Sequence, residues 1–169
     1  MMDSRATNSA ARRGGRGHGA RHACAGFTMI ELLIVIAVLM IVSAIAVPHL
    51  QSAVLSARIS RGVGDVRTIG QAALGYYAEN GAAPNTLADI GYDQQIDPWG
   101  NGYQYLGFTA TTTTAQMRTD SFTVPINTFF DLYSMGADKQ TATSLAAPES
   151  QDDIIWANDG VYMGLASNY

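Results

Sequence analysis

Hydrophobic residues are distributed along the chain in two different ways, and the change falls at Pro48. In residues 27–47, 18 of the 21 residues are apolar and Glu31 is the one charged residue. A helix of that length rises about 30 Å, which is enough to cross the hydrocarbon core of a membrane. The pattern therefore predicts a transmembrane helix over residues 27–48.

After Pro48, apolar residues recur every three or four positions, which is typical of one face of an amphipathic helix. This stripe consists of Leu55, Ile59, Val63, Val66, Ile69, Ala73 and Tyr77. Four glycines, each about 1 kcal/mol less favourable than alanine in a helix, weaken the pattern: Gly62, Gly64, Gly70 and Gly75. With Asn80-Gly81 as a C-cap, the helix is expected to continue over residues 49–81. Together with the apolar segment it would be about 80 Å long, with Pro48 as the place for a kink.

Residues 82–169 have a different character, because they contain 12 of the 15 aromatic residues and include short β-like runs. The predicted strands are residues 103–108, 121–124 and 129–134. Residues 97–102 (DPWGNG) form a strong turn signal, and residues 109–114 (TATTTT) indicate a loop or a sheet edge. The predicted fold class is α+β: a long N-terminal helix, membrane-spanning in its first half, packed on a small antiparallel β-sheet.

Charge divides the chain at the start of the apolar segment. Residues 1–26 carry five arginines against Asp3, a net charge of +4, whereas residues 27–169 carry five bases against 13 acids, a net charge of −8. The first segment has no Leu, Ile, Val or aromatic residue with which to build a core. An RNA-binding arm is one interpretation; a basic leader before the apolar segment is favoured. The positive-inside rule then places the N-terminus in the cytoplasm and residues 49–169 outside.

Glu31 is the anomaly of the apolar segment, because a carboxylate is costly in hydrocarbon. One interpretation is that it lies near the membrane interface. The other is that it meets a cation, but no Lys, Arg or His occurs between residues 23 and 48. The remaining candidate within the segment is an α-amino group created by cleavage just upstream.

Two other export signals are present in weaker form. Residues 44–46 (AIA) resemble a secretory cleavage site, which would release a soluble protein that begins at Val47. The apolar stretch is longer than such signals usually are, however, and it contains Glu31. A lipoprotein signal at Cys24 is weaker still, since the apolar stretch follows the cysteine.

The sequence contains no recognisable catalytic pattern. A nucleophile elbow, a P-loop and an HExxH motif are absent from it. Cys24 is the single cysteine, which excludes an intrachain disulfide and a multi-cysteine zinc site. His49 is the one histidine beyond the basic segment, and it is expected to be an interfacial polar residue. We therefore expect a protein that is not an enzyme.

Acidic residues gather near the C-terminus: Asp131, Asp138, Glu149, Asp152, Asp153 and Asp159. A solvated acidic surface is the ordinary meaning of such a run. The functional alternative is a calcium site, since calcium takes roughly 6–8 oxygen ligands, although the spacing does not match an EF-hand. The residues alone leave both interpretations open.

Residues 26–35 (GFTMIELLIV) resemble the class III signal of type IV pilins and type II secretion pseudopilins. The resemblance implies that a prepilin peptidase cuts between Gly26 and Phe27 and methylates the new Phe27 amino group. It gives Glu31 the role of pairing with the Phe27 amine of a neighbouring subunit. It makes Pro48 the helix-breaking proline at the end of the apolar run. Cleavage would remove the leader, residues 1–26, together with Cys24.

Two later segments narrow the resemblance to the major (G-type) pseudopilins of type II secretion. Residues 97–106 (DPWGNGYQYL) are similar to the family's DPWGNPYQY segment, with Gly102 in place of its usual proline. Residues 131–138 (DLYSMGAD) are similar to its DLYSLGAD segment, and Asp152-Asp153-Ile154 to the acidic start of its next strand. A mature chain without cysteine also favours a pseudopilin, because type IV pilins commonly close a C-terminal loop with a disulfide.

G-type pseudopilins bind calcium in the loop that carries these C-terminal acidic residues. The resemblance therefore implies a structural calcium ion in this chain. The implied ligands are the carboxylates of Asp138, Asp152 and Asp153 and the carbonyl of Met135. Residues 139–151 (KQTATSLAAPESQ) depart from the family, which usually has glycines after the aspartate. We expect the ion to stabilise the loop by neutralising acids that repel one another.

The resemblance implies a structural subunit of the type II secretion pseudopilus. It would lie in the bacterial inner membrane, with the N-terminus in the cytoplasm and residues 82–169 in a periplasmic β domain. The implied partners are further copies in a homopolymer, minor pseudopilins, the prepilin peptidase and an inner-membrane assembly platform, and no nucleic acid. A type IV pilus subunit for adhesion, motility or competence is the alternative. A soluble secreted calcium-binding module released after Ala46 is a third interpretation.

Overall fold

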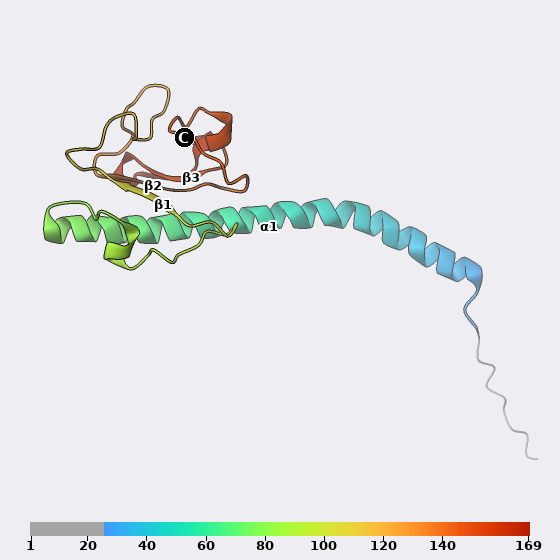
Figure 1. Ribbon diagram of the computed structural model, residues 1–169. Coiled ribbons are helices and arrows are strands. Elements are labelled where there is room, and N and C mark those ends of the chain that lie inside the picture. The colour runs from blue at the N-terminus through green and yellow to red at the C-terminus, as the bar shows by residue number, and fades with distance from the viewer. Residues whose placement is uncertain (1–25) are drawn as a thin grey trace, which may run out of the picture. The chain divides into compact units, whose positions relative to one another are not determined.

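The computed structural model describes residues 26–169. The leader predicted over residues 1–26 therefore lies outside the described residues, apart from Gly26. The described chain consists of helix α1 (Met29–Asn80), strands β1 (Gln104–Gly107), β2 (Phe130–Ser134), β3 (Ile154–Ala157) and β4 (Tyr162–Leu165), and short 3-10 turns (Figure 1). This confirms the predicted α+β class and the long N-terminal helix. The boundary between the chain's two compact units falls after Ser43.

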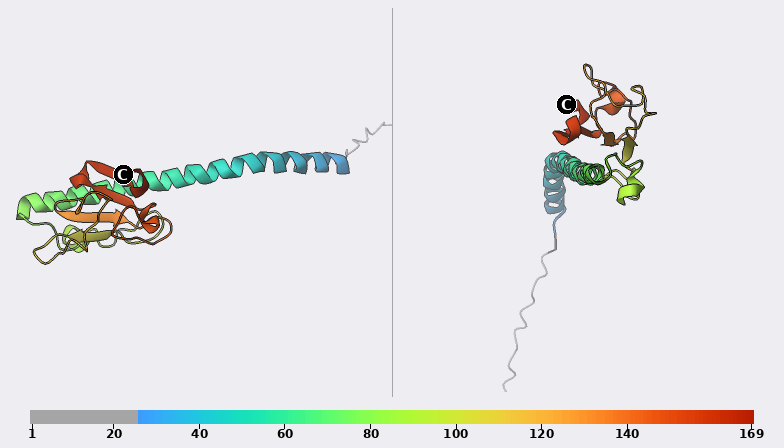
Figure 2. Two further views of the ribbon diagram at one scale, coloured as in Figure 1. Left: turned by 90° about the horizontal axis from the view of Figure 1, so that it is seen from above. Right: turned by 90° about the vertical axis from the view of Figure 1, so that its left-hand side faces the viewer.

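The four strands form an antiparallel sheet in the order β1-β2-β3-β4 within the described residues. Leu132 in β2 lies opposite Tyr105 in β1 and Trp156 in β3, and Trp156 lies opposite Met163 in β4. Figure 2 shows the sheet alongside the green, C-terminal part of α1. The helix thus covers one face of the sheet.

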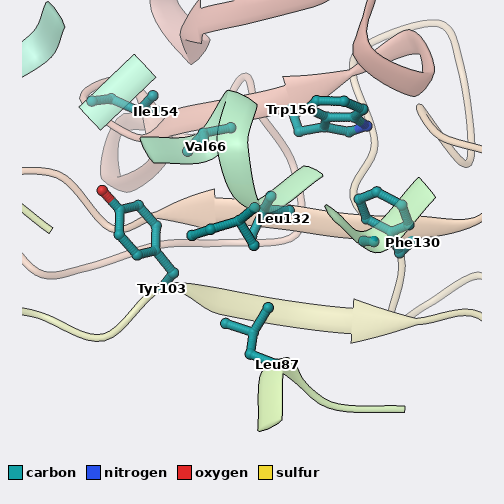
Figure 3. Packing of buried hydrophobic residues seen from close by; sticks show 9 residues of the cluster. Val66, Leu87, Tyr103, Phe130, Leu132, Ile154 and Trp156 are labelled. Atoms are coloured by element: carbon teal, nitrogen blue, oxygen red, sulfur yellow. The ribbon is translucent and has the colours of Figure 1, made fainter. Parts of the chain in front are cut away.

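The core between α1 and the sheet is built from the predicted helical stripe. Val66, Ile69 and Ala73 are fully buried against the sheet, whereas Leu55 is exposed, so the stripe begins to pack at Ile59. Figure 3 shows the side chains that meet there. The buried members of this core are Val66, Ile69, Ala73, Leu87, Tyr103, Phe130, Leu132, Ile154 and Trp156.

Two of the four helix glycines are required by this packing, which the sequence did not indicate. A Cβ added at Gly62 would overlap the side chain of Ile154, and one at Gly70 would overlap the ring of Trp156. Gly64 and Gly75 have open space around the same position. The lower helix propensity of Gly62 and Gly70 is therefore offset by close approach of the helix to β3.

The opposite face of the sheet is covered by irregular segments. A second cluster of buried side chains lies on that face: Ile126, Leu145, Ile155, Ala157 and Ala166. Because both faces are covered, β3 (Ile154–Ala157) is buried at every position. An apolar run without alternation is the pattern expected for such a strand.

The strand predictions were partly wrong. Strands β1 and β2 confirm the runs at 103–108 and 129–134, and residues 109–114 form a loop. Residues 121–124 are not a strand: the Asp120 carboxylate accepts the backbone N–H groups of Phe122 and Thr123, which curls the chain, and Pro125 has no N–H to donate to a ladder. Strand β4 was not predicted, because Tyr162–Leu165 is short and contains a glycine.

The helix ends where the sequence predicted, and it continues through Pro48 as the single long helix that was expected. Gly81 takes a left-handed conformation (φ 69°) and its N–H donates to the Tyr77 carbonyl at 2.8 Å, so Asn80-Gly81 is the C-cap. Pro48 lies inside α1 and does not end it. A proline removes one backbone donor, and the rest of the helical hydrogen bonding continues around it.

The turn at residues 97–102 is organised by a buried carboxylate. Asp97 Oδ1 accepts the backbone N–H groups of Trp99 and Asn101 at 2.9 and 2.8 Å, and Oδ2 accepts the Ser134 hydroxyl at 2.5 Å. This aspartate therefore shapes its own turn and ties that turn to the end of β2.

Candidate functional site

The predicted processing site lies immediately before α1. Gly26, Phe27 and Thr28 precede the first helical residue, and the Phe27 side chain is 80% exposed. An exposed peptide bond between Gly26 and Phe27, outside the helix, is compatible with cleavage by a peptidase. The remainder of the predicted leader, with Cys24, falls outside the described residues.

Glu31 caps the helix in which it lies. The backbone N–H and the hydroxyl of Thr28 both donate to Glu31 Oε2, at 2.9 and 2.8 Å, and the Glu31 N–H donates to the Thr28 hydroxyl at 3.2 Å. This reciprocal arrangement is a capping box, with Thr28 as the N-cap and Glu31 three residues on. The carboxylate is thus satisfied within its own chain at an exposed position. Its pairing with the Phe27 amine of a neighbour stays a prediction.

The apolar half of α1 is exposed along its length. From Met29, which is 92% exposed, to Val47, every side chain apart from the half-buried Ala37 lies on the surface of the single chain. Within the described residues, α1 is the helix whose length and composition suffice to cross a membrane. An apolar surface of this size needs lipid or other protein to cover it.

The acidic loop runs from Met135 to Asp153. Two of the predicted calcium ligands accept hydrogen bonds from the backbone of this loop. Asp152 Oδ2 accepts the N–H groups of Ala137 and Asp138, at 2.6 and 3.1 Å. Asp138 is exposed, and its Oδ1 accepts the N–H of Gln140 at 2.8 Å. Gly136 has a left-handed conformation (φ 63°), and a Cβ there would overlap Asp152. The loop is thereby folded tightly onto Asp152.

The third predicted ligand, Asp153, belongs to a buried ion pair. Its Oδ2 accepts Arg118 Nη2 at 2.5 Å and the Thr141 hydroxyl at 2.7 Å. Arg118 is only 3% exposed, donates through Nη1 to Thr141 at 2.6 Å, and lies 4.0 Å above the centre of the Tyr133 ring. Burial raises the pKa of Asp153 to about 6, against the opposing effects of Thr141 and Arg118.

A second buried aspartate continues this polar cluster. Asp131 Oδ2 accepts the backbone N–H of Arg118 at 2.7 Å, and Oδ1 accepts Asn127 Nδ2 at 3.0 Å. Asn127 Nδ2 also donates to the Trp156 carbonyl at 3.0 Å. Burial raises the pKa of Asp131 above its ordinary value, although the hydrogen bonds from Arg118 and Asn127 oppose this shift. The DLYS segment thus supplies a structural carboxylate on the face of the sheet away from α1.

These contacts do not assemble the predicted calcium ligands into one site. Among the described residues, no group of three or more carboxylate, histidine or cysteine side chains is placed to hold a metal ion. Asp153 Oδ1 is buried without a hydrogen-bond partner within that part of the chain, but its other oxygen already contacts a guanidinium. The donor set therefore does not fit a calcium ion that needs roughly 6–8 oxygen ligands. Calcium binding itself stays a prediction.

Two functional contacts were missed in the sequence. Thr28 and Glu31 match the threonine-x-x-glutamate pattern of a capping box, which lies directly before the apolar run and could have been found. Arg118 gives no comparable signal, because it lies 35 residues from Asp153 in an irregular segment. Its partner is determined by tertiary packing alone.

Comparison with known proteins supports the interpretation of the N-terminal segment as a pilin-like processing signal. Residues 21–47 match the prokaryotic N-terminal methylation motif. The chain is 32% identical to the type II secretion system core protein G of Pseudomonas aeruginosa over 134 residues, which cover 67% of this chain and 83% of that protein. This chain belongs to the core protein G family. Its fold and its N-terminal motif are those of a type IV pilin-like pseudopilin.

A second relative lies further away. The chain is 27% identical to a fimbrial protein of Neisseria meningitidis serogroup A over 144 residues, which cover 85% of each protein. No solved structure matches the chain. The core protein G relationship is the closer of these two, and the exposed apolar helix fits a membrane-anchored, single-pass member of the family.

Proposed function

We propose that this chain is the structural subunit of a type II secretion pseudopilus and polymerises through its N-terminal helix. The observation that carries the proposal is the 32% identity to core protein G over 83% of that protein. The methylation motif at residues 21–47 and the exposed apolar half of α1 support it independently. In this proposal the protein is a building block and carries no catalytic site.

Processing is the first step of the proposed mechanism. The basic leader keeps the N-terminus in the cytoplasm while residues 27–47 rest in the inner membrane and the β domain lies in the periplasm. Prepilin peptidase cuts after Gly26 and methylates Phe27, which creates a cation at the start of the apolar segment. The exposed position of Phe27 before α1 is compatible with this reaction.

Assembly is the second step. Subunits leave the bilayer and pack residues 27–47 against one another in the core of a helical filament, which removes this apolar surface from lipid. Glu31 then needs a positive partner in an apolar environment, and the Phe27 amine of a neighbouring copy supplies it. A subunit at the wrong height would leave a charge unpaired, so the pair determines the axial register.

The capping box supports this mechanism because it gives the Glu31 carboxylate hydrogen-bond partners before assembly. Thr28 donates two hydrogen bonds to the carboxylate and holds it at the first helical turn. There the helix macrodipole favours negative charge. Glu31 is thus accommodated in the single subunit and oriented toward the N-terminal end, where the partner amine arrives.

The proposed partners follow from the pseudopilus. They are further copies of this chain, minor pseudopilins, the prepilin peptidase and an inner-membrane assembly platform driven by a separate cytoplasmic ATPase. Growth of the filament would push folded cargo toward an outer-membrane channel. The second candidate function is a type IV pilus subunit, which the similarity to the fimbrial protein favours.

Deletion of the gene in its native host separates the two functions. We expect the deletion strain to retain its exported proteins inside the cell, and the wild-type gene supplied in trans to restore export. Proteins in the culture medium and in the cell pellet are compared by mass spectrometry. Normal export combined with loss of twitching or DNA uptake would contradict the pseudopilus and support the pilus.

A further inference from the structure

The acidic loop is held in place by contacts from the protein itself. Ser150 joins the two arms of the loop, since its hydroxyl accepts the Ala142 N–H and donates to the Ala142 carbonyl, both at 3.0 Å. Gln151 Nε2 donates to the Leu145 carbonyl at 2.6 Å. Leu145 is buried against Ile155 in the second apolar cluster. The loop is therefore closed by the hydrogen bonds of Ser150 and Gln151 and anchored by the buried side chain of Leu145.

The loop is also tied to the segment that covers the sheet before β2. The Thr119 N–H donates to the Thr143 carbonyl at 2.9 Å, and the Leu145 N–H donates to the Thr119 carbonyl at 2.8 Å. Arg118, the neighbouring residue, sends its side chain to Asp153 and Thr141. One arginine thus connects Thr141, inside the loop, and Asp153, at its end, to the segment beside it.

Arg118 supplies a positive charge to Asp153, one of the carboxylates to which the family resemblance assigns a metal ion. Of the lysine and arginine side chains that the structure describes, Arg118 alone is buried; Arg58, Arg61, Arg67 and Lys139 are exposed. Its guanidinium is permanently protonated and cannot dissociate from the protein. A divalent cation on the second oxygen of Asp153 would lie beside this guanidinium and be repelled by it.

We propose that the Arg118 guanidinium replaces calcium as the counter-charge of the acidic loop, so that the folded β domain does not depend on a divalent cation. Residues 139–151 stand where the family usually has glycines. They supply the Thr141 hydrogen bond to Asp153, the Ser150 hydrogen bond within the loop and the buried Leu145, and they belong to the same adaptation. The positive charge of an arginine side chain, instead of a bound metal ion, holds the loop in position.

Thermal unfolding of the full chain in detergent micelles tests the proposal. Unfolding is followed through the fluorescence of the two tryptophans, with excess calcium chloride in one sample and excess EGTA in the other. We expect the same melting temperature in both. A melting temperature that is higher in calcium than in EGTA would overturn the proposal and restore the predicted metal site.

Variants test the role of the arginine directly. Arg118→Met is expected to lower the melting temperature by about 10 °C, because it leaves the buried Asp153 without a counter-charge. The exposed Arg67→Met serves as the matched control and is expected to melt like the wild type. Adding Asp153→Asn to Arg118→Met removes the stranded charge and is expected to recover much of the loss.

Two further results would decide against the proposal. An Arg118→Met protein that melts at the wild-type temperature would show that the pair does not hold the loop. If that variant does not fold, Arg118→Lys and the comparison of calcium with EGTA on the wild type still apply, and calcium dependence of either protein contradicts the inference. Secretion by the deletion strain tests the proposed function separately.

Discussion

Replacing Glu31 with glutamine is expected to abolish filament assembly while processing and membrane insertion continue. Glutamine retains a carbonyl oxygen that can accept the Thr28 hydrogen bonds, so the capping box survives. It carries no charge, however, and therefore cannot form the proposed ion pair with the Phe27 amine of a neighbour. Sheared filaments are quantified by immunoblotting, and processing is followed by the change in mobility of the chain.

The controls separate loss of charge from loss of folding. Glu79→Gln neutralises an exposed carboxylate near the C-terminal end of the same helix and is expected to assemble normally. Glu31→Ala removes both the charge and the cap, and is expected to fail as Glu31→Gln does. Normal filaments from Glu31→Gln would show that the negative charge is not needed, which would refute the proposed pairing.

Replacing Gly70 with alanine is expected to destabilise the β domain by about 1–3 kcal/mol, the usual cost of overpacking a core. The added Cβ would overlap the Trp156 ring, which is itself packed on Phe130 with 5.8 Å between the ring centroids. The ring therefore has little room to yield. The measurement is the urea midpoint of the full chain in detergent, followed by tryptophan fluorescence.

Gly75→Ala is the matched control for this prediction. Both glycines lie in α1, but the Cβ position of Gly75 faces open space. Alanine there is expected to stabilise the helix by up to about 1 kcal/mol. Two substitutions of the same kind in one helix thus have opposite predicted signs. Equal effects would contradict the close approach of α1 to β3.

The helix and the first two strands could be predicted because local patterns determine them. The three- and four-residue spacing of Val66, Ile69 and Ala73 marks the buried face of α1, and Asn80-Gly81 marks its end. The N-terminal signal could be recognised for a similar reason, since its residues are contiguous. Local sequence carries these features without knowledge of the rest of the fold.

The features that depend on distant contacts could not be predicted in this way. Gly62 and Gly70 read as weak points of a helix until β3 is placed against them. The partner of Asp153 is an arginine 35 residues away, so the acidic residues suggested a metal ligand where the structure has an ion pair. Tertiary packing decides both cases.

The N-terminus of the mature protein tests the central claim most directly. Mass spectrometry of the protein purified from the membrane of its native host identifies the first residue and any modification on it. We expect the chain to begin at Phe27 with a methylated amino group, because cleavage there creates the proposed partner of Glu31. A mature protein that keeps the arginine-rich leader, or that begins at Val47, would contradict the account.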